Sequence, residues 1–130
     1  MSWLSRLLLI GAFGAVGAVC RYLIGQAMLR VVPDYPEAGT LVANAVGCFL
    51  FGLVFQLAFY GHLVSDTARL LLLTGFLGAL TTFSAYAFDG IQLAQTRGFG
   101  AAGAYWLIQN TVGISLAWLG MGVGHWVAGR

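Results

Sequence analysis

The residues best suited to chemistry lie in the stretch 75–89, GFLGALTTFSAYAFD. Two glycines precede a hydroxyl-rich run from Thr81 to Ser84, and an aromatic residue, Tyr86, follows it. Hydroxyl, glycine and β-branched residues are poor material for a continuous helix. Backbone groups freed inside a bilayer must be satisfied by a cavity, an ion or another chain. We therefore predict that an apolar helix breaks here and that the break binds an ion, with free carbonyls on one side and free N–H groups on the other.

A second candidate is Asn44, the one side-chain amide deep in the apolar run 39–60. Thr40, Asn44 and Gly47 follow helical spacing, so they share one face of that helix. A buried amide must find hydrogen-bond partners. Two roles for Asn44 remain open: it bridges two helices, or its NH2 group donates to an anion.

These groups are suited to anion binding rather than to catalysis. The sequence has no nucleophile beside a base, no metal-ligand spacing, no paired carboxylates and no phosphate loop, so we predict that the protein is not an enzyme. The interior of the spans offers an amide, hydroxyls and aromatic ring edges, which suit a small anion better than a cation. The four acidic residues all fall in loops or near the ends of spans: Asp34, Glu37, Asp66 and Asp89.

Composition sets the architecture that must position these groups. Of the 130 residues, 60% are hydrophobic and 19 are glycine, and six basic plus four acidic side chains make only ten charges. Because about 20 apolar residues cross a bilayer, this length allows four crossings and leaves no room for a soluble domain. No signal-peptide cleavage pattern is evident. We expect an all-α integral membrane protein with a single domain over 1–130 and spans at 7–29, 39–60, 68–95 (broken near 79–84) and 100–127.

Arg21 is the one arginine placed well inside an expected span. A long cationic side chain in this position either snorkels to the membrane interface or marks a functional site. In the second interpretation, Arg21 supplies a fixed positive charge in a wet vestibule that attracts anions.

The remaining arginines are almost evenly divided between the two expected sides of the membrane. Arg6, Arg69 and Arg130 share one side, and Arg30 and Arg97 share the other; the chain has no lysine. Such a balance gives little orientation preference under the positive-inside rule. We expect an antiparallel, dual-topology homodimer in which one sequence supplies both halves of an inverted repeat.

Three motifs together resemble the Fluc (CrcB) family of fluoride channels over essentially the full chain. They are the glycine-rich first span ending in Arg21-Tyr22, GTLVANAVG at 39–47, and TGFLGALTTFSAYAFD at 74–89. The resemblance implies four spans per subunit, an antiparallel homodimer in the cell (inner) membrane, and two antiparallel pores along the dimer interface. It implies passive, fluoride-selective export of cytoplasmic fluoride and a central structural sodium ion.

The same resemblance assigns roles to individual residues. Asn44 matches a pore asparagine, and Phe83 matches the first of two pore phenylalanines. The second phenylalanine of the family is replaced by Tyr86, which keeps a ring edge and adds a hydroxyl. The resemblance places the structural sodium on two backbone carbonyls per chain, those of Gly78 and Thr81. The other pore positions that we expect from it are Thr82, Ser84, Tyr105, Ser115 and Thr111.

Two other classes of membrane protein fit part of the pattern. A small dual-topology multidrug exporter shares the length and charge balance but should carry a glutamate in its first span, and this chain has none there. A non-conducting membrane subunit would use the polar residues only to join helices. Neither alternative accounts for Asn44 together with the run from Thr81 to Tyr86.

Overall fold

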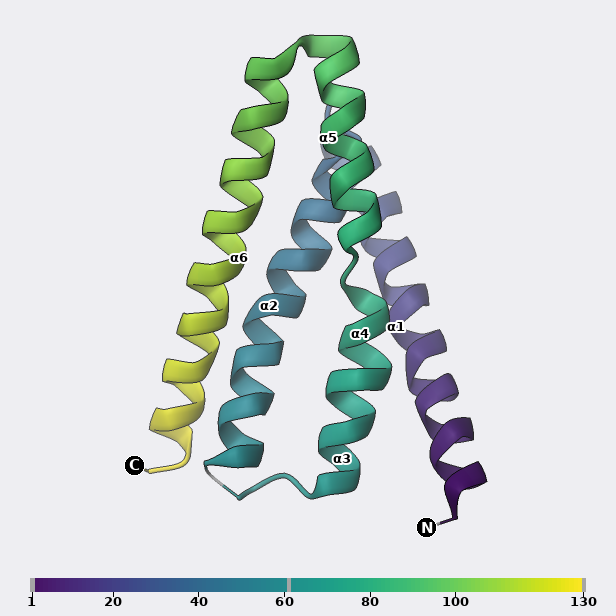
Figure 1. Ribbon diagram of the computed structural model, residues 1–130, viewed down its shortest axis with the longest axis vertical. Helices are drawn as coiled ribbons and strands as arrows, with labels where there is room; N and C mark the ends of the chain where they lie inside the picture. Colours follow the sequence, from purple (N-terminus) through teal and green to yellow (C-terminus); the bar gives the residue numbers. More distant parts are fainter. Residues whose placement is uncertain (1, 61, 130) are drawn as a thin grey trace.

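The computed structural model describes residues 2–60 and 62–129, and every regular element in these ranges is a helix. The chain traverses the long axis of the molecule four times, so that the first and last helices begin and end, respectively, at the same end (Figure 1). The third traverse is composite, because a π-helical segment, a short α-helix and a break precede its last part. The elements are α1 (Trp3–Val31), α2 (Ala38–Phe59), α3 (Asp66–Leu70), η1 (Leu71–Leu77), α4 (Gly78–Leu80), α5 (Phe83–Arg97) and α6 (Phe99–Val127).

Local sequence explains where several helices begin. The Ser2 hydroxyl accepts a hydrogen bond from the Ser5 N–H at 3.2 Å, and the Ser65 hydroxyl accepts one from the Ala68 N–H at 3.2 Å. Such side chains replace the missing carbonyl partners of a first helical turn. Between α5 and α6, Gly98 adopts a φ of 89°, which a glycine tolerates without strain. These polar caps lie outside the apolar runs. The first and third traverses extend beyond the expected spans by a few residues at each end, whereas α2 and α6 agree with the expected spans to within one residue.

The connection between α1 and α2 is fastened to the end of α5. The Arg97 guanidinium donates to the backbone carbonyl of Asp34, lies 3.8 Å from the Glu37 carboxylate, and stands over the Tyr35 ring at 4.9 Å. Arg97 therefore holds the two turns at this end of the molecule together. Arg130, which enters the charge balance of the sequence, lies outside the described residues.

Most large apolar side chains point outward. Among the described residues, three helical stretches are long and apolar enough to cross a membrane: Trp3–Val31, Ala38–Phe59 and Asp66–Arg97. The most apolar window has a mean hydropathy of 2.0 in each of the first two and 1.6 in the third. Only 6% of the most apolar window of the first stretch is buried within the chain. Soluble proteins rarely expose so much continuous apolar surface to water. The protein is therefore an all-helical, multi-pass integral membrane protein.

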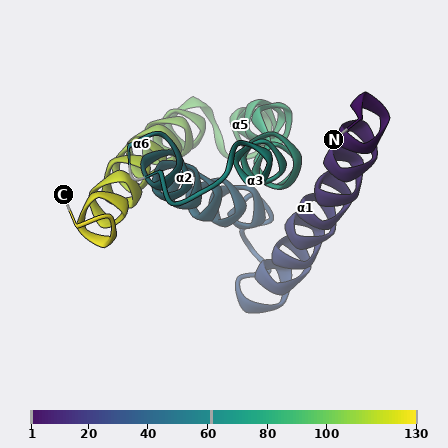
Figure 2. The ribbon, with the colours of Figure 1, turned by 90° about the horizontal axis from the view of Figure 1, so that it is seen from below.

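Glycines allow these helices to approach one another closely. Viewed along the long axis, α1 and α6 lie on opposite sides, with α2 and the composite third helix between them (Figure 2). Gly17 of α1 is buried against the backbone of Phe76, and Gly52 of α2 is buried against the backbone of Ala117 in α6. Small residues at such contacts are the usual basis of helix packing in lipid, because the hydrophobic effect does not drive helices together there.

Candidate functional site

The third traverse leaves the helical conformation at two residues only. Thr81 has φ −84° and ψ 155°, and Thr82 has φ −151° and ψ 122°, so both are extended. This position lies inside the interval 79–84 in which the sequence predicts a break. The Thr82 hydroxyl then accepts a hydrogen bond from the Ala85 N–H at 3.2 Å and so caps the start of α5. The hydroxyl of Thr81 turns back to the Leu77 carbonyl at 3.0 Å, which caps the preceding helical turn.

A second irregularity precedes the break. Leu71–Leu77 form a π-helix, in which the backbone hydrogen bonds are one residue longer than in an α-helix. The N–H of Gly78 still reaches the carbonyl of Leu73. Segments of this kind are rare and often lie at functional sites. Nothing in the residue types of this apolar segment predicts it.

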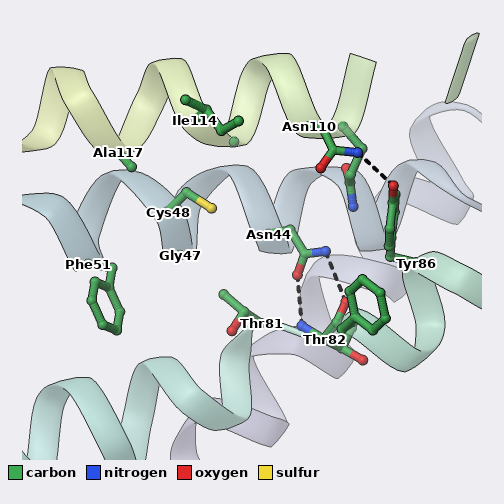
Figure 3. Close-up of a pocket in the computed structure, with 13 residues that line it drawn as sticks. Asn44, Gly47, Cys48, Phe51, Thr81, Thr82, Tyr86, Asn110, Ile114 and Ala117 are labelled. Carbon is green, nitrogen blue, oxygen red and sulfur yellow. Dashed lines mark hydrogen bonds between the residues drawn. The ribbon is translucent and has the colours of Figure 1, made fainter. Parts of the chain in front are cut away.

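Asn44 clamps the break from the neighbouring helix α2. Its Nδ2 donates to the Thr82 carbonyl at 3.1 Å, and its Oδ1 accepts from the Thr82 N–H at 2.8 Å (Figure 3). The side-chain amide thus satisfies both backbone groups of the extended residue, as a neighbouring strand would. Asn44 bridges two helices, the first of the two roles that the sequence leaves open. The amide NH2 still has a second hydrogen, which these two contacts do not use.

Arg21 reaches the other side of the same break. Its Nε donates to the Ala79 carbonyl at 3.1 Å, across 58 residues of sequence, and the side chain is partly buried. Ala79 belongs to the final turn of α4, whose carbonyls have no partner within the helix. A cation at a helix C-terminus is also favoured by the helix dipole. The arginine therefore contacts the last helical turn before the break, and its two terminal NH2 groups are not involved in this bond.

A cavity of about 420 Å³ opens beside the break, between α2, α5 and α6 (Figure 3). Its wall is mainly apolar, and the polar groups gather at one end, around Asn44 and Tyr86. No acidic residue lines it. The lining residues are Asn44, Gly47, Cys48, Phe51, Thr81, Thr82, Phe83, Tyr86, Gln109, Asn110, Gly113, Ile114 and Ala117.

Aromatic rings continue from the cavity wall into the contact between α5 and α6. The Tyr86 ring lies between Phe83, at 5.5 Å between centroids, and Tyr105, at 5.8 Å. The ring planes are tilted at 49° and 35°, so the rings do not stack face to face. Aromatic pairs favour such arrangements over a face-to-face sandwich, because the ring edge is electropositive and the ring face is electronegative. Phe83 is 79% exposed in the single chain, whereas Tyr105 is only 6% exposed.

The structure gathers some of the expected site residues and separates others. Asn44, Thr82, Phe83 and Tyr86 share the cavity, together with Thr81, one of the two residues expected to offer carbonyls to sodium. Gly78 lies one helical turn earlier, at the start of α4. The residues expected to line the pore that do not line this cavity are Ser84, Tyr105, Thr111 and Ser115.

Each of these four residues has a distinct position. The exposed Ser84 hydroxyl lies 3.2 Å from that of Thr82, beside the break. Tyr105 is buried behind Tyr86, and its hydroxyl donates to Asp89 at 3.4 Å. Thr111 and Ser115 are exposed on the outer face of α6.

Two polar residues of α6 that the sequence does not predict as pore residues also line the cavity. Gln109 is only 9% exposed, and its Nε2 has no hydrogen-bond partner among the described residues. Asn110 donates through Nδ2 to the Tyr86 hydroxyl at 2.7 Å. The signal for Gln109 was present in the sequence, because Tyr105 and Gln109 stand four residues apart on one face of the helix.

Comparison with known proteins identifies the family of the chain. A sequence model described as "CrcB-like protein, Camphor Resistance (CrcB)" matches residues 8–121. A protein of Rhizobium etli is 46% identical over 111 residues, which cover 85% of this chain and 86% of that protein. A protein of Nitratidesulfovibrio vulgaris is 35% identical over 124 residues, which cover 95% of this chain and all of that protein.

A third relative, from Aeromonas salmonicida, is 40% identical over 110 residues, covering 85% of this chain and 83% of its own length. All three proteins carry the name fluoride-specific ion channel FluC, which is the name of a transport protein and not of an enzyme. The extent of the family match and the identity to these relatives place the chain in the CrcB (FluC) family of ion channels.

Proposed function

We propose that this protein is a passive, fluoride-selective channel that lets cytoplasmic fluoride leave the cell through the cell (inner) membrane. The observation that carries the proposal is the cavity beside the break, in which an amide, two aromatic rings and the start of a helix meet without an acidic residue. The names of the relatives support fluoride as the ion.

The groups around the cavity suit a small, strongly hydrated anion. Such an ion enters a narrow passage only where close donors replace its water. The second N–H of Asn44, the one free proton of the Thr82–Ser84 hydroxyl pair and the edge of the Phe83 ring are donors of this kind. The N-terminus of the 15-residue helix α5 adds unpaired N–H groups and the positive end of its dipole.

No energy source is needed for export. HF is a weak acid that enters neutral and dissociates inside, so the anion needs only a path down its electrochemical gradient. A negative membrane potential favours this movement by roughly 2.3 kcal/mol per charge and 100 mV. A proton-coupled carrier usually needs a carboxylate within the membrane, and no carboxylate lines the cavity.

The working unit in this proposal is an antiparallel homodimer with four spans per chain. Helix α6 is the fourth span: its 29 residues extend about 43 Å at 1.5 Å per residue, enough for a bilayer. Two polar residues that line the cavity, Gln109 and Asn110, lower the hydropathy of α6. A second chain would cover the exposed ring of Phe83 and close the cavity on its open side, giving two pores along the interface. The nearly balanced arginines support insertion in both orientations.

The same dimer would hold a structural sodium ion between the two breaks. The carbonyls of Gly78 and Thr81 fit a hard cation, because they lie at the C-terminal end of α4, where the helix dipole is negative. Neither carbonyl accepts a hydrogen bond from another described residue. When bound, sodium would be coordinated by these carbonyl oxygens and would join the two chains. Arg21 occupies the neighbouring Ala79 carbonyl and leaves its terminal NH2 groups for a vestibule that attracts anions.

The direct test is ion efflux from liposomes that contain only this purified protein. A fluoride electrode and a chloride electrode read release from the same vesicles. We expect rapid fluoride release without chloride release, and Asn44→Asp should abolish it by placing a negative charge in the anion path. Wild-type efflux from a correctly folded Asn44→Asp dimer would contradict the role of Asn44, and no efflux from well-folded wild-type protein would contradict the channel.

Topology has a separate test. A single cysteine replaces Ser2 in a background in which Cys20 and Cys48 are alanine. We expect a membrane-impermeant thiol reagent to label about half of the chains from each side of the membrane, as equal insertion in both orientations requires. Labelling from one side only would contradict the antiparallel dimer.

A further inference from the structure

Tyr86 and Asn110 form a contact between α5 and α6 at the polar end of the cavity. The Nδ2 of Asn110 lies 2.7 Å from the Tyr86 hydroxyl oxygen (Figure 3). The same nitrogen lies 2.7 Å from the Trp106 carbonyl oxygen. One amide nitrogen therefore donates hydrogen bonds to two oxygen atoms, one on its own helix and one on the neighbouring helix. Both distances are at the short end of the range for N–H···O hydrogen bonds.

The partners fix the direction of this hydrogen bond. A backbone carbonyl only accepts, so the atom of Asn110 that faces Trp106 must be the NH2 nitrogen and not the amide oxygen. An NH2 group has no lone pair to offer a phenol, so the Tyr86 oxygen is the acceptor. The proton of Tyr86 is thus left for another partner. Among residues 2–60 and 62–129, none accepts it.

The surroundings keep this hydroxyl at the cavity wall. The Tyr86 ring is held between Phe83 and Tyr105, and Asn110 fixes the far end of the side chain. The nearest carboxylate on the same helix, Asp89, already receives the hydroxyl of Tyr105. Tyr86 and Asn44 line the same cavity, so the free proton of Tyr86 is available to a ligand there.

We propose that Asn110 is a positioning residue that keeps the Tyr86 hydroxyl as a hydrogen-bond donor to the anion in this cavity. The proposal rests on the proposed function, and it gives a role to the hydroxyl that distinguishes Tyr86 from phenylalanine. A phenylalanine would offer the anion a ring edge only. Tyrosine with Asn110 behind it offers an O–H group whose oxygen is already polarised by a donor, which strengthens its own hydrogen bond.

A double-mutant cycle on fluoride flux tests the coupling. The variants are Tyr86→Phe, Asn110→Leu and the combination of both, each reconstituted in liposomes as the complete protein. We expect the half-saturating fluoride concentration to rise about tenfold in Tyr86→Phe, as for the loss of one hydrogen bond to an ion. Asn110→Leu should show a similar rise, and the double variant should be no worse than Tyr86→Phe alone.

Thr96→Val is the matched control. It removes a hydroxyl that donates to the Gln92 carbonyl at 2.8 Å, on the same helix as Tyr86 but away from the cavity. We expect wild-type fluoride dependence for this variant. An effect of Asn110→Leu that persists in the Tyr86→Phe background would overturn the proposal, because Asn110 would then act independently of the hydroxyl. Wild-type fluoride dependence of Tyr86→Phe would overturn it as well.

A spectroscopic measurement separates this proposal from the channel function itself. The Raman Fermi doublet of tyrosine reports whether the hydroxyl donates or accepts, and subtracting the Tyr86→Phe spectrum isolates Tyr86. We expect an acceptor signature without fluoride, a change toward donation when sodium fluoride is added, and no change with sodium chloride. A fluoride response without flux would contradict the channel and keep the positioning role. Flux without a fluoride response would contradict the positioning role and keep the channel.

Discussion

The two halves of the third traverse are held by different means. The half before the break, from α3 to α4, packs against α1 through glycines that bring backbone against backbone. The half after the break, α5, packs against α6 through side chains, with Leu93, Ala102 and Tyr105 at the centre. The break lies at the boundary between these two kinds of contact. The half before the break is therefore held mainly by contacts between backbone atoms, which cannot change rotamer. The half after the break is held by side chains, which can.

The glycine-mediated contact is the tighter of the two. A Cβ at Gly17 would overlap the Phe76 carbonyl and lie 3.0 Å from its carbonyl carbon and 3.1 Å from the Leu80 nitrogen. On the facing helix, a Cβ at Gly75 would lie 2.9 Å from the Phe13 Cβ and 3.2 Å from the Ile10 carbonyl oxygen. Close backbone approach of this kind stabilises helix pairs in lipid. It also places Arg21 of α1 within reach of the break.

The first prediction exploits this contact. Gly17→Ala should lower the free energy of unfolding by about 3 kcal/mol, the upper part of the usual range for overpacking, because backbone must move to admit the methyl group. Gly11→Ala is the matched control on the same helix, where an added Cβ meets nothing within 4 Å. The measurement is denaturation of purified protein in mixed micelles. Equal stability of the two variants would show that α1 is not held by backbone contact.

The second prediction concerns the clamp on the break. Asn44→Leu should destabilise the protein by about 2 kcal/mol, because it leaves the N–H and C=O of Thr82 without the partners that Asn44 provides. The same variant should lose fluoride flux. Denaturation in micelles and liposome efflux measure the two effects. A variant that keeps its stability would mean that Thr82 finds other partners, and the amide would then serve only the ion.

The residue types predict the break but not its partners. Two adjacent threonines after two glycines disfavour helix and favour capping, and the chain does turn extended at Thr81 and Thr82. The sequence also marks Asn44 as a group that must be satisfied. The sequence does not identify the hydrogen-bond partner of Asn44, because that partner depends on how α2 is rotated against the third traverse.

Helix rotation also explains why the sequence does not predict some residues of the site. Helix α6 is apolar on most of its surface, so no polar stripe marks its inward face. The pairs Tyr105/Gln109 and Thr111/Ser115 therefore look equivalent in the sequence, although the single chain turns only the first pair inward. The π-helix at Leu71–Leu77 has no residue signature either, because leucine suits both helical forms. The contact of Arg21 with Ala79 depends on the close approach of α1, which only the folded chain shows.

The third prediction concerns that contact. Arg21→Gln shortens the side chain and removes the cation at the end of α4. We expect a loss of about 1.5 kcal/mol, as for a hydrogen bond with a charged group. We also expect fluoride flux to fall most at low ionic strength, where an attractive charge acts farthest. Flux that falls by the same factor at low and high salt would contradict the vestibule role and leave Arg21 as a helix cap.

The last prediction tests the contact between α5 and α6 with a glycine-to-alanine substitution, as at Gly17. A Cβ at Gly90 would overlap the indole of Trp106, with Cζ2 at 2.6 Å. Because the obstacle is a side chain, a change of rotamer can relieve it, and we expect Gly90→Ala to cost only about 1 kcal/mol. Gly90→Ala combined with Trp106→Leu should recover part of this loss in the same micelle denaturation.

No substitution of the Phe76 side chain should rescue Gly17→Ala in this way, since the obstacle there is a carbonyl that every residue carries. Phe76→Leu combined with Gly17→Ala provides that comparison. Recovery at Gly90 without recovery at Gly17 is the result that a side-chain contact on one side of the break and a backbone contact on the other require. Equal recovery at both sites would mean that side chains also govern the contact with α1, and the two halves of the third traverse would then be held alike.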